Sequence, residues 1–153
     1  MVFTRVNFAK LSLLSLFFIV SVLQLFSFPG QFAHMRKENG ASLLLTIALA
    51  ALLACLFLCA QISIIALWKI ICHIDSNSFY SANSFLWMNR LVGTLKVATV
   101  FPVLLILIIA PQADDPGVLV LLAAITLFVV TVFVISSLLR DQIQNSPYPL
   151  EVG

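Results

Sequence analysis

The sequence predicts an all-α integral membrane protein with four transmembrane helices and an amphipathic interfacial segment before the third. Of the 153 residues, 62% are hydrophobic and only 9% are charged, whereas a soluble domain carries about 25% charged residues. The apolar residues gather in four stretches, each close to the roughly 20 residues that a helix needs to cross hydrocarbon. We expect one transmembrane domain over residues 1–140 and a short cytoplasmic tail over residues 141–153, which we expect to be disordered.

The four predicted spans cover residues 8–28, 41–68 (or as far as 72), 91–110 and 117–139. Pro29 with Gly30 closes the first span and Pro111 closes the third, because proline disfavours helix in the residue before it and glycine permits a turn. The first span is long for a signal peptide and no clear cleavage pattern follows it, so we expect it to be retained. Together the spans predict a four-helix bundle.

Basic residues near the span ends predict the orientation, because cytoplasmic loops carry an excess of lysine and arginine. One side of the membrane has only Arg36 and Lys37, and the other side has Arg5, Lys10, Lys69, Arg90, Lys96 and Arg140. We therefore expect a cell-membrane protein with both termini in the cytoplasm. The net charge is only +2 and the basic residues are scattered, so direct nucleic-acid binding is not expected.

The segment that precedes the third span is the least generic part of the sequence. At about 100° per residue, an apolar arc contains Phe85, Trp87, Met88, Leu91, Val92 and Leu95. The opposite arc contains Asn83, Asn89, Arg90, Gly93, Thr94 and Lys96, with Leu86 as the one misfit. We expect Ser81 to cap a helix here that lies at the inner interface. Arg90 and Lys96 either contact anionic headgroups or a cytoplasmic partner, or only snorkel from a wet face.

Polar residues inside a span need an account, because they are candidate functional groups. Gln24 and Gln61 each either mark such a site or make a hydrogen bond between helices. Their predicted depths differ, so we do not expect them to share a site. Pro102 lies inside the third span, where it removes a hydrogen bond to the Ala98 carbonyl and predicts a kink. Thr99 is expected to help satisfy that carbonyl.

The turn before the fourth span holds two neighbouring carboxylates, Asp114 and Asp115. One interpretation is a site for a cation or proton at a pore mouth. The other is local, since Asp115 can cap the fourth helix while Pro116 suits its first position. The local interpretation explains the order of these residues without further assumptions.

Three short runs carry a resemblance to a known family. They are residues 74–81 (IDSNSFYS), 90–93 (RLVG) and 113–118 (ADDPGV). With the apolar spans around them, they resemble the bacterial four-helix membrane family called domain of unknown function 2975, most clearly from the second span to Arg140. Many members have lysine or glycine after the first aspartate, where this sequence has Ser76 and Asn77. The resemblance implies a cell-membrane protein without established activity, and suggests a cytoplasmic helix-turn-helix regulator as partner.

No catalytic motif, phosphate loop or metal-ligand spacing appears in the sequence. His73 and Asp75 are too few for a metal site, and Asp75, Ser76 and Asn77 fit a turn better. We therefore expect a non-enzymatic regulatory or partner-binding protein in the lipid bilayer, with no cofactor. The alternative is a small transporter or channel subunit, which requires an oligomer. Its candidate residues are Asp114, Asp115, Gln24, Gln61 and Pro102.

Overall fold

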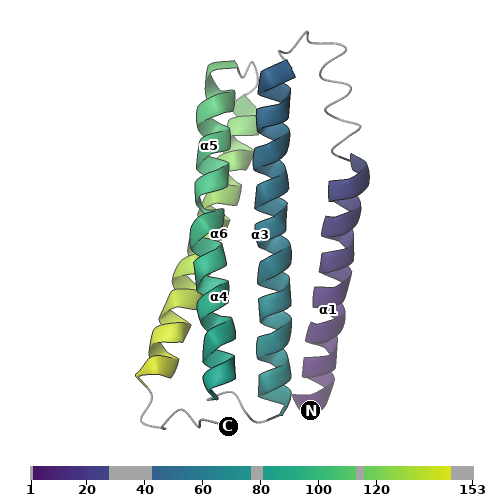
Figure 1. Ribbon diagram of the computed structural model, residues 1–153, viewed down its shortest axis with the longest axis vertical. Helices are drawn as coiled ribbons and strands as arrows, with labels where there is room; N and C mark the ends of the chain where they lie inside the picture. The colour runs from purple at the N-terminus through teal and green to yellow at the C-terminus, as the bar shows by residue number, and fades with distance from the viewer. Residues whose placement is uncertain (1, 28–42, 77–80, 113–115, 146–153) are drawn as a thin grey trace.

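The computed structural model describes residues 2–27, 43–76, 81–112 and 116–145 (Figure 1). These ranges consist almost entirely of helices, and they contain no β-strand. In chain order the elements are α1 (Val2–Val22), the π-helical turn η1 (Leu23–Ser27), α3 (Leu43–Asp75), α4 (Ala82–Ala98), α5 (Val100–Ile109), the 3-10 turn η2 (Ala110–Gln112) and α6 (Pro116–Gln144).

Four helices in these ranges are long and apolar enough to cross a membrane, which confirms the predicted fold class. They are α1 with η1, α3, α4 with α5, and α6. Two of them run further than the apolar composition predicted: α3 continues to Asp75 and α6 to Gln144. The expectation of a disordered tail from residue 141 is therefore wrong for residues 141–144, which are helical. With 33 residues, α3 is about 50 Å long, against a hydrocarbon core of about 30 Å. The difference of about 20 Å means that α3 extends beyond the hydrocarbon when it crosses a membrane.

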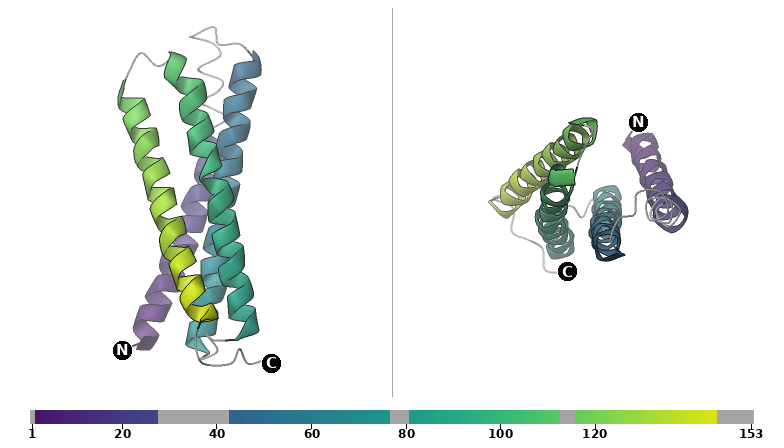
Figure 2. Two further views of the ribbon diagram at one scale, coloured as in Figure 1. Left: turned by 90° about the vertical axis from the view of Figure 1, so that its left-hand side faces the viewer. Right: turned by 90° about the horizontal axis from the view of Figure 1, so that it is seen from above.

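The helices form an open arc in chain order rather than a closed ring (Figure 2). Helix α1 packs along α3, α3 packs against α4 and α5, and these two pack against α6. Seen from above, α1 and α6 stand at opposite ends of the arc. Each terminal helix therefore depends on one neighbouring span for its position, and both keep most of their surface free for lipid.

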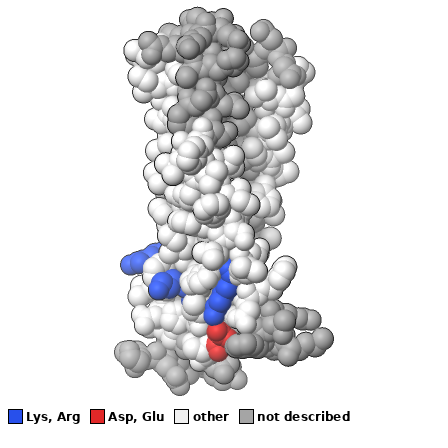
Figure 3. Space-filling view, turned by 90° about the vertical axis from the view of Figure 1, so that its right-hand side faces the viewer, with Lys and Arg blue, Asp and Glu red and all other residues white. Residues whose placement is uncertain are grey.

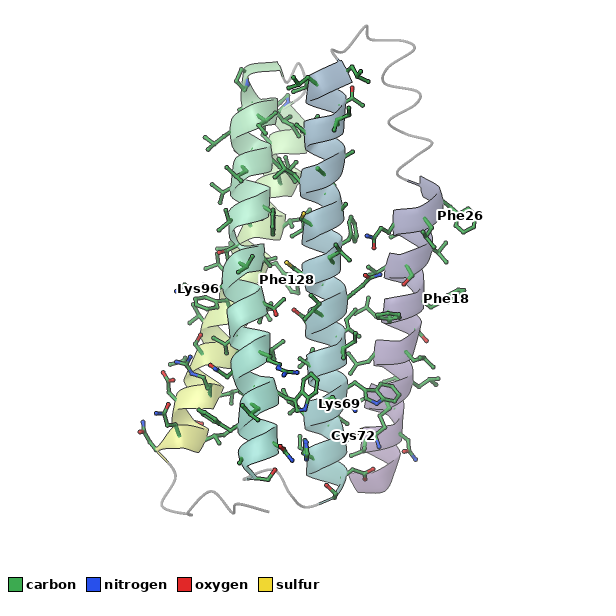
Figure 4. The ribbon with its side chains drawn as sticks, in the orientation of Figure 1. Phe18, Phe26, Lys69, Cys72, Lys96 and Phe128 are labelled. Atoms are coloured by element: carbon green, nitrogen blue, oxygen red, sulfur yellow. The ribbon has the colours of Figure 1, made fainter. Side chains whose placement is uncertain are left out.

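The core lies where α3, α4 and α6 meet, in the half of the molecule that holds the amino terminus (Figure 1). It consists of Ala66, Ile70, Met88, Leu91, Leu95 and Ile143. Elsewhere large apolar side chains point outward, as Phe18 on α1 and Phe26 on η1 do (Figure 4). In water such a surface would be unfavourable, so its exposure agrees with a lipid environment.

The predicted interfacial segment before the third span is not confirmed. Residues Ala82–Ala98 form α4, which continues in line with α5 as one candidate span (Figures 1 and 2). The apolar arc packs inside the protein, where Met88 and Leu91 are buried. The predicted cap is confirmed, since the Ser84 amide donates a hydrogen bond to the Ser81 hydroxyl at 3.3 Å. Amphipathic periodicity alone did not distinguish a helix lying on a membrane from one packed against two neighbours.

Candidate functional site

Apart from Lys96, the lysines and arginines whose side chains the structure describes lie toward one end of the helices, as Figure 3 shows for one face. They come from all four spans: Lys10 on α1, Lys69 on α3, Arg90 on α4, and Arg140 on α6. The alternating direction of consecutive spans brings them to this end, as the sequence predicted. We call this region the basic end.

Two of these cations have a carboxylate partner. Lys10 Nζ lies 2.7 Å from Asp75 Oδ2, and this ion pair joins α1 to the last residue of α3. The second pair is local, since Arg140 donates to Asp141 Oδ1 at 2.7 Å through Nη2 and at 3.0 Å through Nε. Their positive charges are therefore largely compensated within the protein.

Lys69 and Arg90 instead share an aromatic ring. The Arg90 guanidinium carbon lies 4.7 Å from the centre of the Trp87 ring, and Lys69 Nζ lies 6.0 Å from it. Within the described ranges, neither cation pairs with a carboxylate. Trp87 is fixed because it packs against the core, and cations within about 6 Å of an indole are attracted to its face. The arrangement joins α3 to α4 and leaves two positive charges uncompensated.

Lys96 stands apart from this cluster. It is exposed on the outer side of α4, well above the level of Lys69 (Figure 4). Counting about 20 residues back from the end of α5 at Ile109 places the hydrocarbon boundary near Arg90. Lys96 is therefore about 9 Å inside that boundary, which a snorkelling lysine can span.

Gln61 makes a hydrogen bond between helices. Its Nε2 donates to Ser21 Oγ at 3.1 Å, while the Ser21 hydroxyl donates to the Phe17 carbonyl at 2.8 Å. The sequence did not predict Ser21 as the partner, because apolar composition does not define the heights of two spans relative to each other. In the structure α1 with η1 ends lower than α3 (Figure 1). This stagger brings Ser21 to the depth of Gln61.

The helix breaks close to Pro102, which is fully buried. The interruption lies at Thr99, between α4 and α5, one turn before the proline. The Thr99 hydroxyl donates to the Lys96 carbonyl at 2.7 Å and not, as expected, to the carbonyl of Ala98. The interruption falls where the sequence predicted a disturbance, but Thr99 keeps helical backbone angles and α4 continues in line with α5 (Figure 1). The kink itself therefore stays a prediction, and the threonine hydroxyl satisfies a different carbonyl from the one expected.

The sequence analysis also made predictions for the turn before α6 and for the end of α3. Asp114 and Asp115 lie outside the described residues, whereas Pro116 is the first residue of α6, the position that proline favours. At the end of α3, the Ser76 hydroxyl donates to the carbonyls of Cys72 and His73 at 3.1 and 3.2 Å. In the part of the chain that the structure describes, no group of three potential metal ligands is present.

A family model described as "Protein of unknown function (DUF2975)" matches residues 13–146. This chain belongs to that family. Neither the curated proteins nor the solved structures contain a match. The DUF2975 match includes the Lys69, Trp87 and Arg90 cluster, whereas Lys10 precedes it.

Proposed function

We propose that this DUF2975 protein is a non-enzymatic regulatory protein of the cell membrane, which acts by binding a protein partner through one face of α4. This free face of α4 carries Asn83, Leu86, Asn89, Arg90, Gly93, Lys96 and Val97, all of them exposed. Its members recur every three or four residues, the spacing by which one helix packs against another. The opposite face of α4 is already covered by α3 and α6.

Gly93 is the observation that carries this proposal. Glycine inside a helix costs about 0.5–1 kcal/mol relative to alanine. A Cβ at Gly93 would meet no atom within 4 Å, so packing within this chain does not require a glycine at this position. Glycine in a membrane helix allows another helix to approach closely. A partner helix packed on the free face of α4 would explain why a glycine occupies position 93.

The basic end supports a cytoplasmic location for this partner. Because lysine and arginine are enriched on the cytoplasmic side, we infer that both termini and the connection before α4 face the cytoplasm. The free face starts at this end and runs into the span. Gly93 lies about 4.5 Å beyond Arg90 along α4, inside the hydrocarbon, so the helix that packs on it belongs to a membrane partner. The helix-turn-helix regulator that the family resemblance suggests can contact only the cytoplasmic part of the free face, from Asn83 to Arg90, and we expect it there by analogy.

Photocrosslinking in cells tests the proposal. A benzophenone amino acid at Asn89 places the probe on the free face, and the same probe at Leu138 provides the control. Leu138 is exposed on α6, near the basic end but on another surface. We expect a discrete protein adduct from position 89 that disappears when Gly93→Leu is added. Equal adducts from both positions, or adducts containing only this chain, would contradict the proposal.

The second candidate function is that of a transporter or channel subunit within an oligomer. The interruption at Thr99 beside buried Pro102 favours it, because a break within a span provides a point at which a helix can bend. Flux measurements in reconstituted vesicles test it. Loss of flux in the variant with Asp114→Asn and Asp115→Asn would support it, and absence of flux at every tested pH would remove it.

A further inference from the structure

The geometry around Trp87 points to a binding site for the phosphate group of an anionic phospholipid, formed by Lys69 from α3 and Arg90 from α4. This inference does not rest on the partner-binding role, because it concerns the contact between two helices of this chain and the surrounding bilayer. We call these three residues the Trp87 site.

Charge compensation distinguishes the Trp87 site from the rest of the basic end. Lys10 and Arg140 each have a carboxylate at 2.7 Å. Lys69 and Arg90 have none among the described residues, although both approach the same indole. Among the described residues, the two positive charges at the Trp87 site therefore have no negative partner. An anion that reached both cations would compensate the two charges.

The depth of the site fits the lipid phosphate. A helix needs about 20 residues to cross the hydrocarbon. Counted back from Ile109 at the end of α5, this length ends near Arg90 on α4. Counted forward from Leu43 at the start of α3, it ends before Lys69. Both cations consequently lie at the level of the headgroups. Tryptophan also concentrates at this level, because its ring is apolar and its N–H is polar. A phospholipid in the adjacent leaflet would place its phosphate at this height without leaving the bilayer.

The chemistry of the side chains fits a phosphate oxygen. The planar guanidinium of Arg90 can donate two parallel hydrogen bonds to it, and the Lys69 ammonium adds a point charge. The indole restricts both cations, so that less side-chain entropy is lost on binding. Exposure of Lys69 and Arg90 leaves them accessible from the bilayer. Free inorganic phosphate has the same chemistry, but it lacks acyl chains that hold it at this depth.

Tryptophan emission provides a direct test. The chain has two tryptophans, so a Trp68→Phe background leaves Trp87 as the only indole. The full-length protein in neutral detergent is titrated with short-chain phosphatidylglycerol, with phosphatidylcholine of the same chains, and with inorganic phosphate. We expect a saturable change with phosphatidylglycerol at concentrations at least about tenfold below those of the other two, the step that 1.4 kcal/mol represents.

Two double variants separate the site from general charge. Lys69→Gln with Arg90→Gln should weaken phosphatidylglycerol binding at least about tenfold. Lys10→Gln with Arg140→Gln removes an equal number of positive charges from the basic end and should leave phosphatidylglycerol binding within about twofold of the original. Lys69→Arg with Arg90→Lys keeps both charges and should retain binding, which guards against a folding defect. Equal losses in the two glutamine variants would overturn the site. Saturation by inorganic phosphate at the same concentration, or no preference over phosphatidylcholine, would overturn the lipid assignment.

Discussion

Lys10 and Asp75 form a 2.7 Å ion pair that fixes where α1 stands along α3. Because α1 packs mainly on α3, this pair and the hydrogen bond from Gln61 to Ser21 are its polar anchors in the described structure. They lie at different heights, and both are formed in the arrangement that places the end of α1 below that of α3 (Figure 1).

Reversal of the ion pair tests this role. Lys10→Asp alone places two carboxylates side by side, so we expect α1 to separate from α3 and the melting temperature in detergent to fall. Adding Asp75→Lys should restore most of the loss. The difference should shrink at 1 M salt, where exposed charges are screened. If the double variant melts as early as the single one, the pair does not position α1.

A double-mutant cycle measures the hydrogen bond between Gln61 and Ser21. Hydrogen bonds between membrane helices contribute about 0.6 kcal/mol on average, so we expect Gln61→Leu and Ser21→Ala to show a coupling energy of that size in reversible unfolding. The hydroxyl of Ser63 bonds the Cys59 carbonyl of its own helix, and Ser63→Ala therefore serves as the uncoupled control. Strict additivity of Gln61→Leu and Ser21→Ala would show that the bond contributes nothing.

Gly93→Ala should separate stability from partner binding. The added methyl group enters open space, so unfolding free energy should rise by about 0.5–1 kcal/mol, while crosslinking from position 89 should weaken. Most substitutions that impair an interaction through misfolding lower stability instead. A drop in stability would show that Gly93 serves the fold, contrary to the proposal.

Pro102→Ala should repair the helix at Thr99. Alanine restores the amide that bonds the Ala98 carbonyl, and hydrogen exchange of the backbone between α4 and α5 should slow. Pro116→Ala is the matched control, because Pro116 occupies the first position of α6, where no intrahelical bond is replaced. Unchanged exchange after Pro102→Ala would place the cause of the break in Thr99 itself.

Fusions at the two termini test the orientation. We expect green fluorescent protein at either end to fluoresce and alkaline phosphatase at either end to be inactive, because both ends belong with the basic end. Substituting Lys69, Arg90 and Arg140 by glutamine should weaken this bias. Active phosphatase at the carboxyl terminus would exclude the cytoplasmic assignment.

The fold class followed from composition because hydrocarbon imposes a simple condition: a span needs about 20 apolar residues in a helix. The grouping of Lys10, Lys69, Arg90 and Arg140 also followed, since four consecutive spans alternate in direction. The Ser81 cap and the first position of Pro116 were local, and local patterns were sufficient for both. The helix ends were predicted less accurately, because apolar composition marks the hydrocarbon boundary rather than the last helical residue.

Tertiary structure alone decided how the helices stand beside one another. Lateral order, the open arc and the stagger of α1 depend on packing between residues far apart in the chain, for which apolar periodicity carries little information when lipid and protein are both apolar. For this reason the sequence of α4 predicted an interfacial helix, whereas in the structure its apolar arc packs against α3 and α6. The pairing of Gln61 with Ser21, and the convergence of Lys69 and Arg90 on Trp87, likewise appear only once neighbouring helices have a defined height and rotation.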